Sequence, residues 1–414
     1  MACVLFVSHS SEMHGAEKSL ELFLRRVDKT ILQPVVAMPG KGPLFGMISR
    51  LGLPVYDVPM HWWVPPSNYP PWRLAAEYRT LPRRVNALCD IARRHRCQAV
   101  HTNSLVVVDG ALAASLEGLP HVWHVREDPC AESGLEPVLG WAVTLNLTEI
   151  LSERVVAVSH ATRRWFNISS RVEVIYNGVE LEEVPPAILP GKPDSLKVAF
   201  VGNFTERKGP DLFVKACLRL EGVEADFYLV GEHSDKGVTS KVNGLLEGSP
   251  NRDRFHLLGF RPDAPAVLSA CDIYVLSSRD DPFPRTVLEA MAAGCAVVVT
   301  DCGGAPEAVR ACSAGEVVEI GAEAIVGGLN RLIRNPDYMC QCRESARSLV
   351  REKFSAASYV ARLCGLLQET AAMPRSESSL DKLLRDLMAT GKRTLVEELT
   401  LYLKSVLRWN FGRK

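Results

Sequence analysis

Strand-length apolar runs recur along the chain and alternate with longer segments that carry apolar residues at helical spacing. In the first half such runs occupy residues 3–7, 34–38 and 99–102, and in the second half residues 197–202 and 226–231. Alternating strand and helix patterns are typical of βαβ units and a parallel sheet. The chain is therefore predicted to be α/β, with a βα series that restarts near residue 197.

Three further segments of the first half carry expectations of their own. Residues 60–73 form a loop crowded with proline, which excludes regular structure there, and we expect helices over about 72–96 and 136–151. The aromatic side chains of the loop stack on the sugar rings of a ligand, rest at a membrane interface or only pin the loop to its own domain; they are Trp62, Trp63, Tyr69 and Trp72.

A domain boundary is predicted between the two βα series. Residues 172–180 run from a strand into an Asn-Gly turn, and the proline-rich stretch 184–193 has the composition of a linker. We predict four parts: a first domain (1–180), a second domain (181–354), a helix that follows it (355–372) and a basic amphipathic extension (373–414).

Composition narrows the class of protein. Lys+Arg and Asp+Glu are equal at 48 each, which argues against a protein that wraps nucleic acid. The 12 cysteines form no CxxC pair, so we expect neither a zinc site nor a disulfide framework, and reduced thiols in a cytosol. The apolar N-terminus lacks a basic region and reads as a buried strand, not a signal peptide, and no apolar stretch reaches the roughly 18 to 20 residues of a membrane span.

The strongest chemical pattern lies in residues 275–304, which read as strand, loop, helix and strand. Asp281 in the loop and Glu289 in the helix are eight positions apart, so both can face the crevice at the carboxyl ends of parallel strands. The helix start offers the backbone N–H groups of Arg285 and Thr286 to an anion such as a diphosphate. Alternatively, Glu289 is simply a solvated helix residue.

A second pattern follows the strand at 197–202. Arg207 and Lys208 precede a helix beyond the carboxyl end of that strand, which suits them to clamp a diphosphate. The alternative is a solvated basic loop. Gly15, at a strand-to-helix turn, lets backbone approach a ligand, although such turns are common in α/β proteins.

Taken together, these motifs resemble a known family. Asp281-x7-Glu289, followed by Ala-Met-Ala-Ala-Gly and by Thr-Asp-Cys-Gly-Gly-Ala-Pro-Glu at 300–307, looks like the donor-site signature of the retaining family 4 glycosyltransferases. The resemblance covers about residues 4–369 and implies the GT-B fold, in which two Rossmann-like βαβ domains face a deep cleft. It implies that the domain at 1–180 binds the acceptor, that the domain at 181–354 binds the donor, and that the helix at 355–372 crosses back to the first domain. A C-terminal helical extension follows in this chain. The family usually has Glu where Asp281 stands and Gly-Phe-Gly where Pro-Phe-Pro follows it.

The resemblance also implies roles for individual residues. Glu289 would hold the ribose and Asp281 would lie near the transferred sugar. His124 would lie beside that sugar, with a core histidine, or a contribution from His121 or Arg126 in its place, as the alternatives. The implied catalytic set is His124, Asp281, Lys208 and Arg207. The implied donor-binding set is Gly15, Asn203, Lys208, Phe260, Arg261, Phe283, Arg285, Thr286 and Glu289.

Within these sets some positions depart from the family pattern. The family's arginine after the first strand of the second domain is Asn203 here, so Arg207 is the expected substitute. Phe260 and Arg261 are expected beside the nucleobase, and His14 stands where the family has a first glycine before Gly15.

The expected activity is a metal-independent, retaining transfer of a hexose to a hydroxyl of a glycan or glycolipid, in cell-surface polysaccharide or lipid-linked glycan synthesis. UDP- or GDP-sugars are the expected donors, and no cofactor, metal or nucleic acid is expected. The alternative is an inactive GT-B protein that only binds nucleotide sugars. An oxidoreductase is disfavoured because neither first βα turn reads Gly-x-Gly-x-x-Gly.

The C-terminal extension has apolar residues at helical spacing, at 395, 399, 402, 403 and 406, with Lys404 and Arg408 beside them. This pattern suits an anionic membrane surface or a protein contact. The protein is therefore expected in the cytoplasm, peripheral to the membrane.

Overall fold

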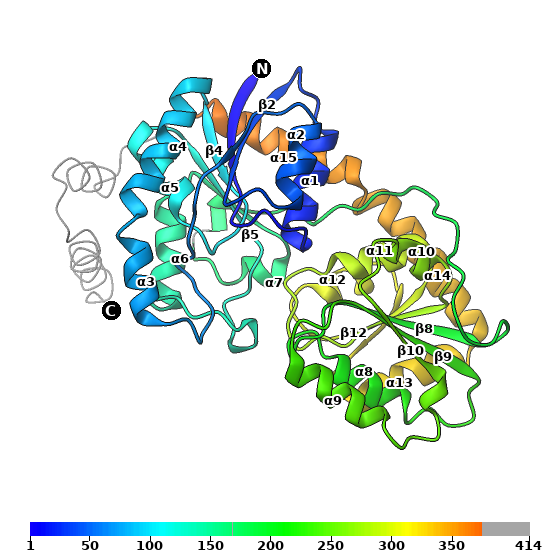
Figure 1. Ribbon diagram of the computed structural model, residues 1–414. Helices are drawn as coiled ribbons and strands as arrows, with labels where there is room; N and C mark the ends of the chain where they lie inside the picture. The colour runs from blue at the N-terminus through cyan, green and yellow to red at the C-terminus, as the bar shows by residue number, and fades with distance from the viewer. Residues whose placement is uncertain (168, 375–414) are drawn as a thin grey trace, which may run out of the picture. The chain divides into compact units, whose positions relative to one another are not determined.

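The computed structural model describes residues 1–167 and 169–374 and divides into two compact units (Figure 1). Of the described residues, unit 1 comprises 1–158, 163–167, 169–175 and 360–374, and unit 2 comprises 159–162 and 176–359. The predicted extension at 373–414 lies almost wholly outside the described residues.

Unit 1 contains a seven-stranded sheet whose named strands all pair in parallel, in the order β3-β2-β1-β4-β5-β6-β7. Its central strands are buried because helices cover both faces, which explains their nearly continuous apolar sequence. The strands are β1 (Ala2–Val7), β2 (Leu32–Met38), β3 (Val55–Asp57), β4 (Ala99–Thr102), β5 (His121–Val125), β6 (Arg154–Ala157) and β7 (Val172–Val174).

The helices of unit 1 pack on this sheet, with α1 and α2 on one side and α4 and α5 on the other (Figure 1). They are α1 (Gly15–Arg26), α2 (Pro43–Arg50), α3 (Pro71–Tyr78), α4 (Leu81–His95), α5 (Asp109–Glu117) and α6 (Trp141–Ile150), with 3-10 turns at η1 (Ala131–Ser133) and η2 (Ser169–Arg171).

Three helix predictions in unit 1 need correction. The single helix expected over 72–96 is two helices, because Pro82 has no N–H and its ring would clash with the carbonyl of Tyr78, where α3 ends. The helix expected from residue 136 begins only at Trp141, after Gly140 in a positive-φ conformation. Helix α2 was not predicted, and α3 begins inside the proline-rich stretch because Pro71 is tolerated in a first turn.

Unit 2 contains a six-stranded parallel sheet in the order β10-β9-β8-β11-β12-β13. The strands are β8 (Leu196–Val201), β9 (Ala225–Val230), β10 (Phe255–Gly259), β11 (Ile273–Leu276), β12 (Ala296–Thr300) and β13 (Gly315–Val318). Helices α8, α9 and α13 lie over one face of the sheet and α10 and α11 over the other (Figure 1).

The helices of unit 2 follow the βα series predicted from the apolar pattern. They are α8 (Pro210–Cys217), α9 (Lys236–Leu246), α10 (Ala264–Ser269), α11 (Arg285–Ala293), α12 (Ala305–Arg310), α13 (Ala322–Ile333) and α14 (Pro336–Lys353), with a 3-10 turn at η3 (Arg252–Arg254). Two more helices carry the chain between units: three of the four residues of α7 (His160–Arg163) belong to unit 2, and the unit boundary falls inside α15 (Ala356–Ala371).

Strand order locates the ligand-binding edge of each sheet. In unit 1 the chain winds outward from β1 through β2 to β3 and then restarts on the other side of β1 with β4; in unit 2 the same reversal separates β8 from β11. In open α/β sheets, ligands bind beyond the carboxyl ends of the strands at such a reversal. The ligand site of unit 2 is therefore expected in the loops after β8 and β11.

The proline-rich linker is irregular and is tied to unit 2. The Ala187 N–H donates to the Ala266 carbonyl at 2.9 Å, and the Tyr228 hydroxyl donates to the Pro190 carbonyl at 2.7 Å.

All 12 cysteines are free thiols, and no described helix is long and apolar enough to cross a membrane.

Candidate functional site

Lys208 and Asp281 lie against each other at the strand-order reversal of unit 2. Lys208 follows β8 and Asp281 follows β11, and the Lys208 Nζ donates a hydrogen bond to Asp281 Oδ2. The Arg207 guanidinium approaches the same carboxylate at 3.9 Å, and it donates to the Asp280 carbonyl at 2.9 Å. Two cations from one loop thus converge on the acidic loop of the neighbouring strand.

Helix α11, which follows the loop that contains Asp281, carries Arg285 and Glu289 at the same edge of the sheet. Glu289 lies one turn into the helix, where its carboxylate is 3.5 Å from the Arg285 guanidinium. The Arg285 guanidinium also donates to the Gly178 carbonyl at 2.9 Å, and the Thr286 hydroxyl hydrogen-bonds with the Tyr274 hydroxyl at 2.7 Å. Pro284, at the N-cap position of α11, makes no side-chain capping hydrogen bond, and the first N–H groups of an α-helix have no partner within the helix.

The Phe283 side chain is part of the packed interior of unit 2. It is buried, with its ring centroid 4.8 Å from that of Tyr176 and 5.7 Å from that of Phe354. Its carbonyl accepts a hydrogen bond from the Asn177 side chain at 3.0 Å. Any donor contact made by Phe283 must therefore come from its backbone.

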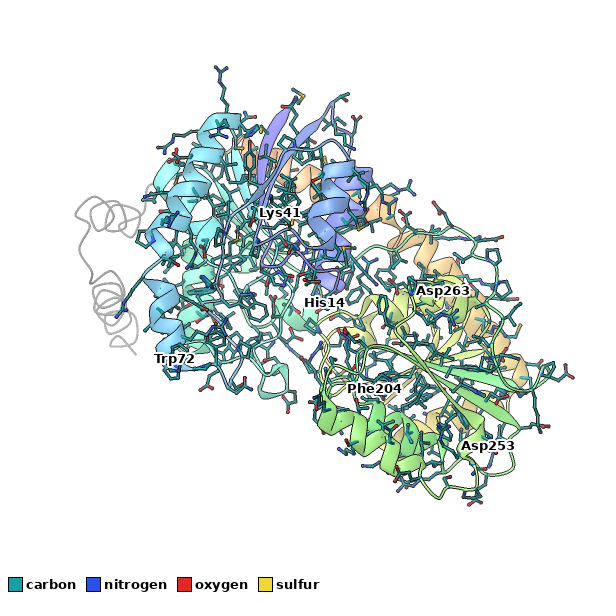
Figure 2. The ribbon with its side chains drawn as sticks, in the orientation of Figure 1. His14, Lys41, Trp72, Phe204, Asp253 and Asp263 are labelled. Carbon is teal, nitrogen blue, oxygen red and sulfur yellow. The ribbon has the colours of Figure 1, made fainter. Side chains whose placement is uncertain are left out.

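The nucleobase candidates stand at the end of β10. The Phe260 side chain is 69% exposed, so an aromatic face is available there. Arg261 forms two hydrogen bonds with the Asp263 carboxylate, of 2.7 and 2.6 Å (Asp263 is labelled in Figure 2). Asn203 is half-buried directly after β8, on the same edge of the sheet.

In unit 1, Gly15 opens helix α1 after the loop that follows β1. A side chain added at Gly15 would meet no atom within 4 Å, so the space above this backbone is open, and His14 beside it is exposed (Figure 2). An approaching ligand would find the start of α1 unobstructed within this unit.

His124 lies inside β5 and is completely buried, at 0% exposure. Its Nδ1 lies 3.3 Å from His101 Nε2 and 3.5 Å from Arg126 Nη2, while its Nε2 has no hydrogen-bond partner among the described residues. Burial, followed by the charge of Arg126, lowers the pKa of His124 well below its ordinary value, and the same two causes lower the pKa of His101 to about 3. Both rings are therefore neutral near pH 7.

The aromatic loop residues have different surroundings. Trp63 is a core residue that stacks on Trp123 at 5.7 Å and donates to the Leu105 carbonyl at 2.6 Å. Trp62 is half-buried beside His9, and the Tyr69 hydroxyl donates to the Glu77 carboxylate. Trp72 is 74% exposed on α3 (Figure 2). Packing thus explains Trp63, and Trp72 is the freest of the four.

Glu307 has a role that its place in the motif did not reveal. Its carboxylate accepts hydrogen bonds from the N–H groups of His160 and Ala161, at 2.9 and 2.7 Å, and from the Tyr176 hydroxyl at 2.9 Å. It therefore caps the first turn of α7, which lies 147 residues earlier in the chain. Sequence reasoning also missed Arg279 and Asp211, whose partnership across 68 residues leaves no local signal.

Comparison with known proteins identifies the family. The family model described as "Glycosyltransferase Family 4" matches residues 13–183, and the one described as "Glycosyl transferases group 1" matches residues 186–349. The chain belongs to the group 1, family 4 glycosyltransferases. The predicted family is thereby confirmed, and the two matches meet at the predicted linker.

Relatives within this glycosyltransferase family are distant. D-inositol 3-phosphate glycosyltransferase of Mycobacterium ulcerans is 29% identical over 197 residues, 44% of this chain and 41% of the relative. UDP-Gal:alpha-D-GlcNAc-diphosphoundecaprenol alpha-1,3-galactosyltransferase of Escherichia coli is 26% identical over 242 residues, 53% of this chain and 61% of the relative. The chain thus spans less than two thirds of these relatives.

A solved structure confirms the fold. HepE of Anabaena in complex with UDP-glucose superposes with a TM-score of 0.73 at 20% identity, covering 89% of this chain and all of the other. The family member described here therefore has the GT-B fold, with one Rossmann-like half in each unit. Among its described residues, no group of three or more His, Cys, Asp or Glu side chains is arranged to hold a metal ion.

Proposed function

We propose that this protein is a retaining glycosyltransferase that moves a hexose from a nucleotide-diphosphate sugar to a hydroxyl of a glycan or glycolipid. The observation that carries the proposal is the convergence of Lys208 and Arg207 on Asp281, at the strand-order reversal of unit 2. The start of α11 and the carboxylate of Glu289 follow along the same loop and helix.

The cations would act on the leaving group. Departure of a nucleoside diphosphate builds up negative charge, and preorganised cations that meet this charge lower the barrier. Lys208, Arg207 and the first N–H groups of α11 supply positive potential from one edge of the sheet. Asn203 stands where the family has an arginine. Because Arg207 reaches Asp281 and the Asp280 carbonyl, it can take the role of that arginine. Charge neutralisation by these groups needs no metal ion.

The acidic residues and His124 would act on the sugar half of the donor. Glu289 would accept hydrogen bonds from the ribose hydroxyls, and Asp281 would stabilise positive charge that develops on the transferred sugar. His124 is neutral and lacks a partner at Nε2, so we assign it a sugar hydroxyl to orient, which requires the loops around it to open. Attack from the face that the diphosphate leaves would retain the anomeric configuration.

Relatives narrow the donor and the acceptor. The E. coli relative is named for UDP-galactose and a lipid diphosphate acceptor, and HepE was solved with UDP-glucose. We therefore propose a UDP-hexose donor, with a GDP-sugar as the second choice, and an acceptor in glycolipid or cell-surface polysaccharide synthesis. We further propose that the protein acts at the cytoplasmic side of a membrane and is held there by its C-terminal extension.

The first test measures binding and transfer with purified protein. UDP-, GDP-, ADP- and dTDP-sugars are screened by thermal shift, because a ligand that binds the folded state raises the melting temperature. Lys208→Ala and Glu289→Ala should each lower kcat/KM for the donor that binds by at least about 100-fold, roughly 2.7 kcal/mol of barrier, with little change in melting temperature without ligand. NMR of the product should show the anomeric configuration of the donor.

Matched controls separate the outcomes. Lys236→Ala, an exposed lysine of α9, should transfer like the wild type. Wild-type turnover by Lys208→Ala or Glu289→Ala would refute the assigned roles. Nucleotide-sugar binding with neither transfer nor hydrolysis would favour the alternative, an inactive binding protein, which the departures at Asp281 and Asn203 make worth testing.

A further inference from the structure

One buried carboxylate in unit 2 serves neither the core nor the site as described so far. Asp211 lies in the first turn of α8 and has 0% exposure. The Arg279 guanidinium holds both of its oxygens, at 3.0 Å each. Lys241 approaches it at 2.9 Å and Lys215 at 3.6 Å, both from partly exposed positions.

Arg279 reaches past this carboxylate to the loop that carries the cations. Its Nη1 donates to the Glu206 carbonyl at 2.5 Å, and its backbone N–H donates to the Arg207 carbonyl at 2.7 Å. Arg279 itself stands in the loop after β11, directly before Asp280 and Asp281. A single side chain thus joins the two loops of the candidate site.

The two loops are joined at further points. The Ser277 hydroxyl donates to the Gly209 carbonyl at 2.7 Å, and Gly209 has a positive φ of 63°. A side chain at Gly209 would clash with the Ser277 carbonyl, so the loops approach each other as closely as backbone allows. Arg207 closes the set through the Asp280 carbonyl, at 2.9 Å.

We infer that the Asp211–Arg279 pair is a positioning device for the diphosphate-binding cations. Asp211 fixes the Arg279 fork, and the fork holds the Glu206 carbonyl, while the Arg279 backbone N–H holds the Arg207 carbonyl. Together these contacts set where the Lys208 and Arg207 side chains begin. Neither Asp211 nor Arg279 contacts the donor; both act through Lys208 and Arg207. The inference rests on the proposed function, because it takes these two cations as the diphosphate ligands.

A binding experiment distinguishes positioning from general stabilisation. The probes are UDP, GDP, ADP and dTDP, each compared with its nucleoside monophosphate by calorimetry on the full chain. Asp211→Asn and Arg279→Lys should each bind the preferred diphosphate about tenfold more weakly, or about 1.4 kcal/mol. Monophosphate affinity should stay within about twofold, since only the second phosphate depends on the placed cations. Arg279→Lys keeps the charge but loses the two-pronged geometry, so charge alone should not rescue binding.

Lys215→Ala serves as the control. It removes a cation that lies 3.6 Å from Asp211 on helix α8, outside the loop, and it should bind diphosphate like the wild type. Equal losses of monophosphate and diphosphate affinity, or wild-type diphosphate binding by Asp211→Asn and Arg279→Lys, would overturn the inference alone. If Asp211→Asn fails to fold, Arg279→Lys decides. Absence of nucleotide binding by the wild type would instead overturn the proposed function, and this inference with it.

Discussion

At the scale of single residues, the acidic and basic groups of the candidate site are already paired with each other. Lys208 contacts Asp281, and Arg285 lies 3.5 Å from Glu289. Under the proposed function, a nucleotide-diphosphate sugar would exchange these ion pairs for contacts with its own phosphates and ribose. The free energy of donor binding then includes the cost of separating them.

Asp281→Asn tests this exchange. Removing the carboxylate frees Lys208 and takes a negative charge away from the incoming diphosphate, so UDP should bind several-fold to about tenfold more tightly. Transfer should nevertheless slow by about 10- to 100-fold, because the charge that stabilises the developing positive charge on the sugar is lost. Calorimetry with UDP and a steady-state transfer assay measure the two effects.

Glu232→Gln is the matched control for Asp281→Asn, since Glu232 is an exposed acid that follows β9 at the same edge of the sheet. It should change neither quantity by more than about twofold. Weaker UDP binding by Asp281→Asn would contradict the exchange of ion pairs.

At the scale of elements, the start of helix α8 depends on a buried charge. Burial would raise the pKa of Asp211, but hydrogen bonds from Arg279 and Lys241 outweigh it and lower the pKa to about 2. A carboxylate whose folded-state pKa is depressed stabilises the fold fully above its unfolded-state value near 3.8. That contribution is lost as the pH falls through the folded-state value.

The free energy of unfolding should therefore fall between about pH 4 and pH 2, with Asp211 contributing on the order of 2 kcal/mol. Urea titrations at several pH values measure it. Asp211→Asn should flatten this part of the profile, whereas Asp337→Asn, at an exposed position of α14, should leave the wild-type profile. An Asp211→Asn profile as steep as the wild type would show that the pair does not hold the carboxylate ionised in the folded state.

At the scale of the whole molecule, both sheets and helix α15 are complete by Ala371. A chain ending at residue 374 should therefore keep the melting temperature and UDP affinity of the full chain. The sequence of the extension beyond it suits an anionic membrane surface, because basic residues flank its apolar positions, or a protein contact, and we propose the first. Only the full chain should sediment with phosphatidylglycerol vesicles, and neither chain with phosphatidylcholine. Equal binding of the truncated chain to anionic vesicles would move the membrane contact elsewhere.

Much of the fold was predictable because parallel strands and their helices leave local patterns. Apolar runs marked most strands, and the linker composition marked the place where the two family matches meet. Element ends were less predictable. Pro82 split one expected helix, because a proline effect acts on a single residue within an otherwise helical pattern, and the short α2, of 8 residues, was missed.

The sequence by itself determined the α/β class, the family, the loops that carry Lys208 and Asp281, and the helix that carries Glu289, since these follow from local apolar periodicity and short motifs. Only the tertiary structure decided which charges meet: Arg279 with Asp211 across 68 residues, and Glu307 with the start of α7 across 147. It also decided that Trp63 and His124 are buried. The physical reason is strand order. Loops become neighbours when the sheet places β11 beside β8, and no local pattern in the chain encodes that adjacency.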